Sequence, residues 1–387
     1  MAALVAATCC ALWAAHGAEL TVKSLLDETF VASDNYFLSP NPPGPTYIST
    51  TSGMLDLVAR TPTSNFELRG DLHYRHYWGP GAQNRPDAWE PGVKAAFDTT
   101  EKLTKYNFAA SWYRQEAVIV QLLETGTATV GGYVDTTLIE GGLRHELSPT
   151  DTLTWVNHAA SVEFTDPTRF PFTDAYTEGG WIHKWNRTTD VTTTVQFERL
   201  ATDNPEHSQV LFWRLLAGPQ TNLSNNLNVK AAFGVALIEI DNPSATLLTT
   251  PGSLALATIP GSVTTWLGNL EVTYKLRETD QLSLIAARTV APTSLGSVQG
   301  TESVGLSLRH DLTRLSWVYI FGGVTRIVPL VGTPSDLFSA SVAFTYRLTP
   351  EWRTQLTYRF DQRKDTTSTA QANTFLVSLA RDWTVLP

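Results

Sequence analysis

The chain has 387 residues, of which 42% are hydrophobic and only 17% charged, and its 37 acidic and 28 basic side chains give a formal net charge of -9. This composition excludes collagen, coiled coils and highly charged disordered chains. The acidic balance also argues against nucleic acid as a partner, because phosphate contacts require clustered lysine and arginine.

The first predicted element is a secretory signal peptide. Residues 2–15 are apolar and nearly uncharged, and the stretch is too short to span a bilayer as a helix. Ala15 and Gly17 supply small residues at the positions that determine cleavage. We therefore expect residues 1–17 to be a signal peptide and residues 18–387 to form a single domain.

Both cysteines, Cys9 and Cys10, lie within this signal segment. A lipid anchor is the alternative interpretation, although the residues before Cys9 match such a signal poorly. The mature chain is then expected to contain no cysteine, so its own hydrogen-bonded framework must hold it together.

Long segments of alternating polarity follow the signal. Trp266, Leu270 and Tyr274 share one parity of their segment, while Glu271 and Lys275 share the other. A period of two indicates a β-strand whose two faces have different surroundings. The same alternation recurs in residues 66–74, 227–237 and 352–360. These strands are about twice the usual globular length of ~5 to 6 residues.

Two kinds of turn separate these strands. Short polar turns fall at residues 60–65, 99–103, 148–151, 186–190, 223–226, 277–280, 311–314 and 348–351. Longer connections rich in Pro, Gly, Ser, Thr and Asp lie between them, as at residues 33–46, 79–87, 166–174 and 241–261. Eight short turns join sixteen strands, and one strand before them (20–30) and one after them (373–383) make eighteen. Sixteen is the alternative count, and either even number places both chain ends on one side.

The short turns recur at intervals of roughly 40 residues, which is also the length of a β-propeller blade. The strands distinguish the two architectures. Burying Glu67, Arg69 and Asp71 in a dry core costs several kcal/mol for each unpaired charge, whereas a water-filled lumen keeps them hydrated. The opposite face is apolar and needs a large apolar environment, which lipid supplies. We therefore predict an all-β, transmembrane, antiparallel up-and-down β-barrel, whose closure leaves no unsatisfied sheet edge.

Charged side chains of luminal parity are the candidate pore-lining residues: Glu67, Arg69, Asp71, His73, Arg75, Glu271, Lys275, Arg309, Arg347, Arg353 and Arg359. Residues 291–387 carry nine basic and seven acidic side chains, so the closing strands are net basic and the earlier ones net acidic. We expect a field across the pore that filters solutes by charge. The alternative is that these charges are only hydrated and pair locally.

Tryptophans near strand ends are the candidates for a membrane-interface girdle: Trp78, Trp89, Trp185, Trp266, Trp352 and Trp383. Their amphipathic rings suit the boundary between lipid and water. The alternative is that tryptophan is simply common in strands.

Residues 27–37 (DETFVASDNYF), the hairpin 54–78 and the repeated Leu-Ser/Thr-x-x turn resemble the matching parts of a known group, the porin-type bacterial outer-membrane β-barrels, including those encoded beside exopolysaccharide genes. The resemblance implies a place in the bacterial outer membrane, with lipid, lipopolysaccharide and the barrel assembly machinery as partners. One departure is that such barrels usually end on an aromatic residue, whereas residues 384–387 follow Trp383 here.

The sequence contains no Gly-x-Ser-x-Gly or His-Glu-x-x-His motif and no phosphate-binding loop. His73 and His76 are close in sequence, but their parity places them on opposite faces of one strand, so no metal site is expected. We therefore expect no cofactor and no enzymatic activity. The expected function is a pore for passive passage of small hydrophilic solutes or a secreted glycan. The alternative is a non-conducting surface structural or assembly barrel whose long loops bind a partner.

Overall fold

The structure, a computed structural model, describes residues 17–83, 85–125, 131–167, 169–203, 208–241, 261–292, 298–329 and 333–386. Apart from Gly17, the predicted signal peptide with Cys9 and Cys10 lies outside these residues. Among the described residues, no helix is both long enough and apolar enough to cross a membrane.

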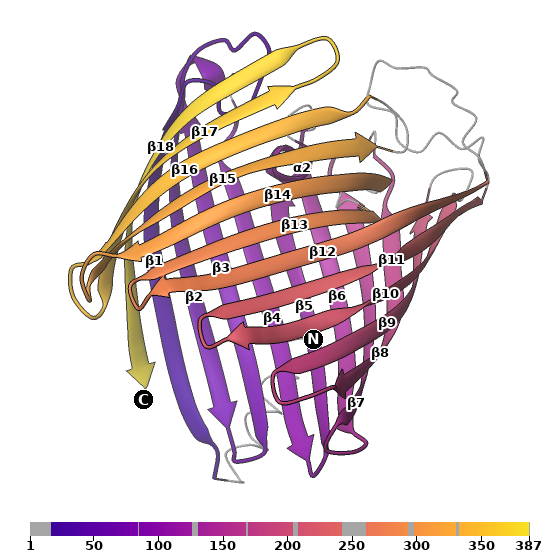
Figure 1. Cartoon of the computed structure of the whole chain (residues 1–387). Helices are drawn as coiled ribbons and strands as arrows, with labels where there is room; N and C mark the ends of the chain where they lie inside the picture. The colour runs from indigo at the N-terminus through magenta and orange to yellow at the C-terminus, as the bar shows by residue number, and fades with distance from the viewer. Residues whose placement is uncertain are drawn as a thin grey trace.

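Eighteen antiparallel strands form one sheet that closes on itself (Figure 1). The strands are β1 (Glu19–Ser33), β2 (Thr46–Arg60), β3 (Ser64–Trp78), β4 (Ala88–Glu101), β5 (Thr104–Glu116), β6 (Tyr133–Glu146), β7 (Asp151–Phe164), β8 (Phe172–Lys184), β9 (Thr189–Thr202), β10 (Gln209–Ser224), β11 (Leu227–Asp241), β12 (Ser262–Arg277), β13 (Asp280–Pro292), β14 (Val298–Asp311), β15 (Ser316–Pro329), β16 (Ser335–Arg347), β17 (Trp352–Lys364) and β18 (Thr369–Leu386). Two short helices, η1 (Pro80–Ala82) and α2 (Ala117–Thr125), lie in the connections. The predicted all-β barrel and its count of eighteen strands are confirmed.

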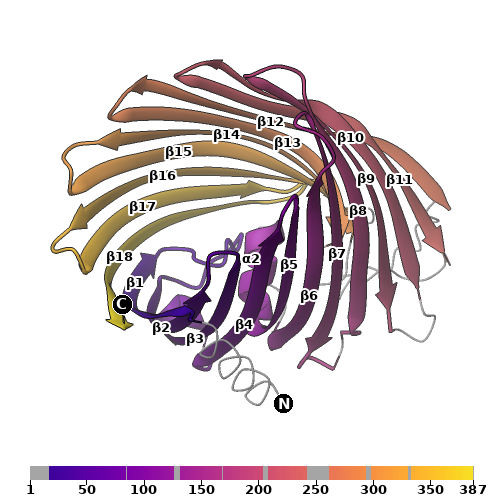
Figure 2. The ribbon, with the colours of Figure 1, turned by 90° about the horizontal axis from the view of Figure 1, so that it is seen from below.

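Each strand pairs with its neighbours in sequence, and β18 pairs with β1 to close the ring. All eight predicted short turns join consecutive strands, from β2–β3 to β16–β17, at one end of the barrel. The other end carries the longer connections, which we call the long-connection end, and there a short turn at residues 365–368 joins β17 to β18. Figure 2 shows the ring of strands with α2 inside it.

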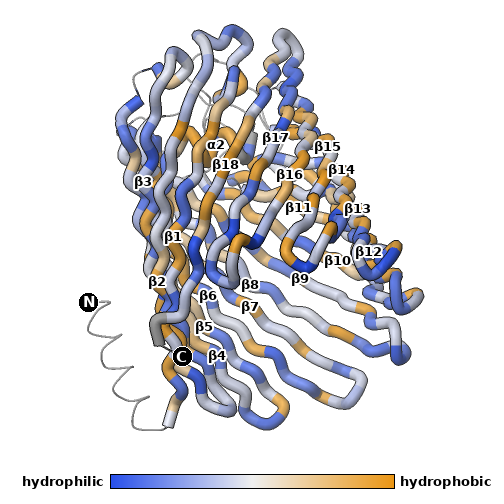
Figure 3. Tube along the Cα trace, turned by 90° about the vertical axis from the view of Figure 1, so that its left-hand side faces the viewer, coloured by the Kyte–Doolittle hydropathy of each residue, from blue (hydrophilic) through white to orange (hydrophobic). Residues whose placement is uncertain are grey.

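Hydrophilic and hydrophobic residues alternate along the strands, as the colouring of Figure 3 illustrates. This alternation gives the barrel two different faces. Large apolar side chains on the outer face are open to the surroundings, including Leu72, Val304, Leu306 and Phe375. Their sequence neighbours face the lumen, and register carries each face from strand to strand; Leu306, for example, lies opposite Leu284 of β13. The predicted period-two pattern therefore produces an apolar exterior. The inner face carries the charged residues, but near the long-connection end of β6–β12 it also holds a buried apolar cluster that includes Phe172, Phe212 and Ile238.

Pairing between adjacent strands is interrupted at two places at the long-connection end. β4 and β5 pair only from Gly92↔Tyr113 onward, and Pro91, which has no backbone N–H, stands at the break. β12 and β13 separate beyond Gly268↔Arg288, and in Figure 1 they diverge towards the long connections. Backbone groups at both breaks need other partners, which the lumen supplies.

Candidate functional site

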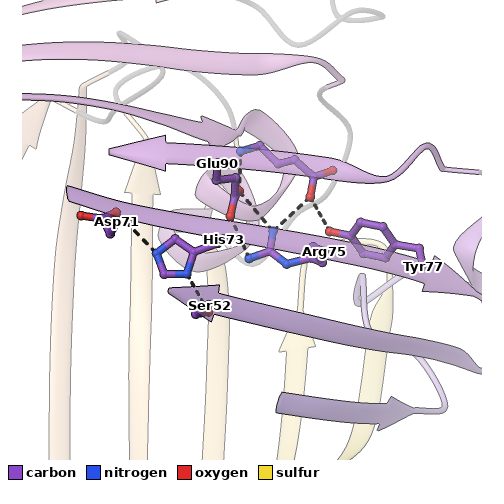
Figure 4. A network of polar contacts seen from close by, with 7 residues as sticks. Ser52, Asp71, His73, Arg75, Tyr77 and Glu90 are labelled. Carbon is purple, nitrogen blue, oxygen red and sulfur yellow. Dashed lines mark hydrogen bonds and ion pairs between the residues drawn. The ribbon is translucent and has the colours of Figure 1, made fainter. Parts of the chain in front are cut away.

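β3 brings a row of polar side chains to the luminal face, where Arg69, Asp71, His73 and Arg75 occupy alternate positions. Figure 4 shows the last three of them. Arg69 Nε lies 3.7 Å from Asp71 Oδ1, and His73 Nε2 lies 3.6 Å from Asp71 Oδ2. His73 Nδ1 also forms a 2.8 Å hydrogen bond with the Ser52 hydroxyl on β2. Four residues predicted to line the pore thus form a continuous polar row.

The part of this row nearest the long-connection end is an ion-pair network around Arg75, drawn in Figure 4. Arg75 contacts Glu90 with both terminal nitrogens, at 3.2 and 3.1 Å, and contacts Glu116 at 3.0 Å. The Tyr77 hydroxyl donates a hydrogen bond to Glu116. Both glutamates are almost fully buried, so Arg75 supplies the positive charge that their burial requires.

The same network seals the break between β4 and β5. The backbone N–H of Glu116 donates a 2.8 Å hydrogen bond to Glu90 Oε1, where a strand neighbour would otherwise accept it. A pocket of about 320 Å³ lies beside the break and is lined by residues of β3, β4 and β5, including Arg69, His73 and Lys94. The break is thus compensated by a hydrogen bond to a side chain rather than by backbone pairing.

α2 begins directly after Glu116 and fills part of the barrel interior. Val118 is fully buried, and Leu122 packs against a small cluster that includes Leu38, Ala370 and Ala372. Gln299 of β14 donates a 3.3 Å hydrogen bond to the carbonyl oxygen of Glu124, which ties the helix to the far wall. The sequence prediction did not identify this helix; its one signal is a run, AVIVQLL, that lacks a period of two.

The connection at residues 34–45 also folds into the lumen. The Asn35 side chain donates to the carbonyl oxygens of Ser39 and Gln371, each at 2.8 Å. Burial raises the pKa of the neighbouring Tyr36 phenol, while Arg75 and Arg359 act in the opposite direction. The two arginines that act on Tyr36 come from opposite ends of the chain, β3 and β17.

A second ionic group lies on the luminal face of β6–β10. Arg214 forms a buried ion pair with Glu198, and its other terminal nitrogen donates a 2.8 Å hydrogen bond to the carbonyl oxygen of Val290. Val290 belongs to the segment of β13 that no longer pairs with β12. Arg214 supplies a hydrogen-bond donor to the backbone at that break, as Glu90 supplies an acceptor at the first. Sequence reasoning missed Arg214, whose Val290 partner lies 76 residues away in sequence.

The predicted basic residues of the closing strands occupy two levels. Arg347 and Arg353 are paired in register beside the turn at residues 348–351, and Arg309 also lies near the short turns. Arg359 lies nearer the long-connection end, with its Nε 2.6 Å from Asp361. Only Arg359 therefore shares the neighbourhood of Tyr36 and Arg75, and the four arginines do not form one ring.

The remaining predicted luminal residues are more open. Glu271 lies 3.6 Å from Lys230 across β11 and β12, and both side chains are about half exposed. Lys275 is in register with Gln281 close to a short turn, and Glu67 is in register with Val58 near the same end. These charges lie near the short-turn end of the barrel.

The six predicted girdle tryptophans fall at two levels of the outer face. Trp78, Trp89 and Trp266 lie near the long-connection end, whereas Trp185, Trp352 and Trp383 lie near the short turns. Several contact neighbouring side chains: the Trp89 ring lies tilted against that of Tyr74, Trp266 lies under the Arg288 guanidinium, and Trp352 and Trp383 lie beside that of Arg381. Their membrane-interface role stays a prediction.

Comparison with known proteins places this geometry among outer-membrane channels at the level of fold. The sequence matches no protein family and no curated protein. Solved structures similar to it include Acinetobacter baumannii OccAB2, with 10% identity, 95% of this chain and 98% of that chain covered, and a TM-score of 0.53. Pseudomonas aeruginosa OccK2 (OpdF) in complex with glucuronate has 11% identity, coverage of 94% and 98%, and a TM-score of 0.51. P. aeruginosa OpdK with vanillate has 11% identity, coverage of 94% and 99%, and a TM-score of 0.51. These proteins are bacterial outer-membrane porins, so the expected porin-type barrel fold is confirmed.

Proposed function

We propose that the chain forms a channel in a bacterial outer membrane through which small hydrophilic solutes, or a secreted glycan, pass by diffusion. The observation that carries this proposal is the closed wall of eighteen strands, which is apolar outside and bears charged groups of β3–β5 and hydroxyl groups of β13–β16 on its inner face. Barrels of this strand number enclose an aqueous channel. The two levels of tryptophan on the outer face fit the two interfaces of a bilayer.

The comparisons support a small solute as the cargo. OpdF is seen with glucuronate and OpdK with vanillate, both small organic molecules. The proposal includes lipid, lipopolysaccharide and the barrel assembly machinery as partners, and it assigns neither a catalytic step nor a cofactor. Passage of a glycan is the finer part of the proposal, and the exopolysaccharide resemblance of the sequence is its first support.

Charge selection within the lumen belongs to the same proposal. Arg75 and Arg359 both act on the buried Tyr36, while the acidic Glu140, Glu178 and Glu198 lie on the luminal face of β6–β9. A field between these walls orients polar solutes as they pass.

Reconstitution tests the proposal directly. The barrel is inserted into planar bilayers for conductance recording and into liposomes for swelling assays with sugars of graded size. We expect stepwise ion conductance and swelling rates that fall as the sugar becomes larger. A folded barrel that gives neither current nor swelling would refute passive passage.

A non-conducting surface barrel is the second candidate, favoured by α2 and residues 34–45 inside the lumen. In that case the wild-type barrel stays closed, while a variant lacking residues 117–132 conducts. Conductance of the wild type at the outset decides against this candidate.

A further inference from the structure

The luminal face of β15 carries three aromatic side chains in succession: Trp317, Tyr319 and Phe321. Val318 and Ile320 between them face outward, in register with the outward residues of β16. Alternate residues of a strand lie roughly 6–7 Å apart, so the three rings form a line of roughly 13 Å along the lumen. We call these three residues the aromatic track.

Two glycines that are paired in register across β14 and β15, Gly305 and Gly323, make room for one ring of this track along the wall. A Cβ atom at Gly323 would lie 2.8 Å from Phe321 Cζ, and one at Gly305 would lie 3.0 Å from Phe321 Cε2. The Phe321 ring thus occupies space that ordinary side chains at these two luminal positions would take. It lies over the two glycines, which leaves a ring face available to the lumen.

Hydroxyl and amide groups border the track. Two adjoining pockets of about 290 and 310 Å³ share Ser283, Ser307 and Tyr319 as lining residues. Ser339 adds a hydroxyl to the first pocket, and Gln355 adds an amide to the second. Tyr319, common to both, is 39% exposed. The two pockets are therefore consecutive polar spaces along one aromatic line.

Two predicted pore-lining arginines lie beside Trp317, at the end of the track nearest the short turns. The guanidinium carbon of Arg309 is 5.1 Å from the centroid of the Trp317 ring, and that of Arg347 is 6.0 Å from it. Both guanidinium groups are thus held near the indole by cation–π attraction, with hydrogen-bond donors beside the ring.

We propose that the aromatic track binds pyranose rings of an oligosaccharide as they move through the lumen. The C–H face of a pyranose is apolar and packs on the negative face of an aromatic ring, while its equatorial hydroxyls reach sideways for hydrogen bonds. The track offers both at once: ring faces in line, and Ser, Gln and Arg groups at their sides. Small ions need no aromatic line, and a purely apolar ligand needs no hydroxyl border.

This inference rests on the proposed channel and names the solute class of that same lumen. The test compares wild type with Tyr319→Ala and Phe321→Ala, using maltohexaose and cellotetraose as probes. One readout is transient blocking of ion current in planar bilayers. The second, isothermal titration calorimetry on the detergent-solubilised barrel, needs no conductance.

We expect at least one of the two sugars to bind and to interrupt the current, and binding to be roughly tenfold weaker in each alanine variant. Tyr319→Phe, which keeps the ring, should retain binding. Phe344→Ala, which removes an exposed aromatic from the outer face of β16, is the matched control and should match wild type. Each variant is shown to be folded if its ion conductance and its mobility in an unheated gel equal those of the wild type.

The outcomes separate the two proposals. A barrel that conducts ions but binds neither sugar, or whose alanine variants bind as well as wild type, overturns the aromatic track while the channel stands. A barrel that binds sugar in the calorimeter but never conducts keeps the track and overturns passive passage.

Discussion

The two sides of the lumen achieve polarity by different means. On β3–β5, the ionic wall, Glu90 and Glu116 are buried and both are paired with Arg75, whose side chain is 15% exposed. On β13–β16, the aromatic–hydroxyl wall, the track residues and the hydroxyl groups beside them remain accessible. Charges that are already paired hold the structure, whereas groups left open are available to a solute. The comparison teaches that the most strongly charged part of a pore need not be the part that binds.

The largest expected effect comes from the ionic wall. Arg75→Met leaves two buried glutamates without their cation, which should lower the free energy of unfolding by about 3–5 kcal/mol. Urea titration of the barrel refolded into lipid vesicles measures this loss. Arg69→Met, which removes a guanidinium that is 44% exposed, is the control and should change stability by less than about 1 kcal/mol. Equal losses in the two variants would contradict the structural role of the Arg75 network.

A smaller effect is expected at the aromatic–hydroxyl wall. Gly323→Ala places a methyl group against Phe321 and should cost about 1–3 kcal/mol of stability. Gly322→Ala is the neighbouring control, because a Cβ there meets nothing within 4 Å on the outer face. Thermal unfolding of the two variants checks the difference, and identical midpoints would show that Phe321 is not held against the wall.

Charge reversal sharpens the comparison for ions. Arg359→Glu puts a carboxylate beside Asp361 near Tyr36, so the reversal potential in a KCl gradient should shift towards cation selectivity. Arg353→Glu, whose parent side chain is 48% exposed near the short turns, should shift it less. An unchanged reversal potential in both variants removes the charge filter from the proposed function.

The smallest effect is expected where a pair is open to water. Lys230 and Glu271 lie 3.6 Å apart with both side chains nearly half exposed. Lys230→Gln should change the free energy of unfolding by less than about 1 kcal/mol, because water and salt screen the pair. A loss comparable to that of Arg75→Met would show that exposure does not separate the two kinds of charge.

Sequence patterns predicted the barrel because its strands and hairpins are determined by residues close together in the chain. The period of two in segments such as 266–276 identifies strands and their two faces, and polar turns such as 277–280 fix where hairpins reverse. Hairpin pairing then follows from chain order, so strand count and neighbours need no long-range information.

The candidate site was harder to predict from the sequence because its contacts join residues that are far apart in the chain. Arg75 reaches Glu116, which is 41 residues away, and Arg214 reaches Val290, which is 76 residues away. α2 was missed because its apolar run resembles a buried strand as much as a helix. The aromatic track lies in a stretch, residues 316–321, whose apolar residues at both parities obscure which face is the lumen.

The seam between β1 and β18 has a consequence for how the protein is made. There the Thr374 hydroxyl donates to Ser33, a residue 341 positions earlier, and twelve register partners depend on the same meeting of chain ends. The barrel can close only after its final strand has been synthesised, because one edge of β1 pairs with β2 but its other edge has no partner except β18. Until then the incomplete sheet has two unpaired strand edges that can pair with other chains and aggregate. The protein therefore needs a chaperone until these edges join.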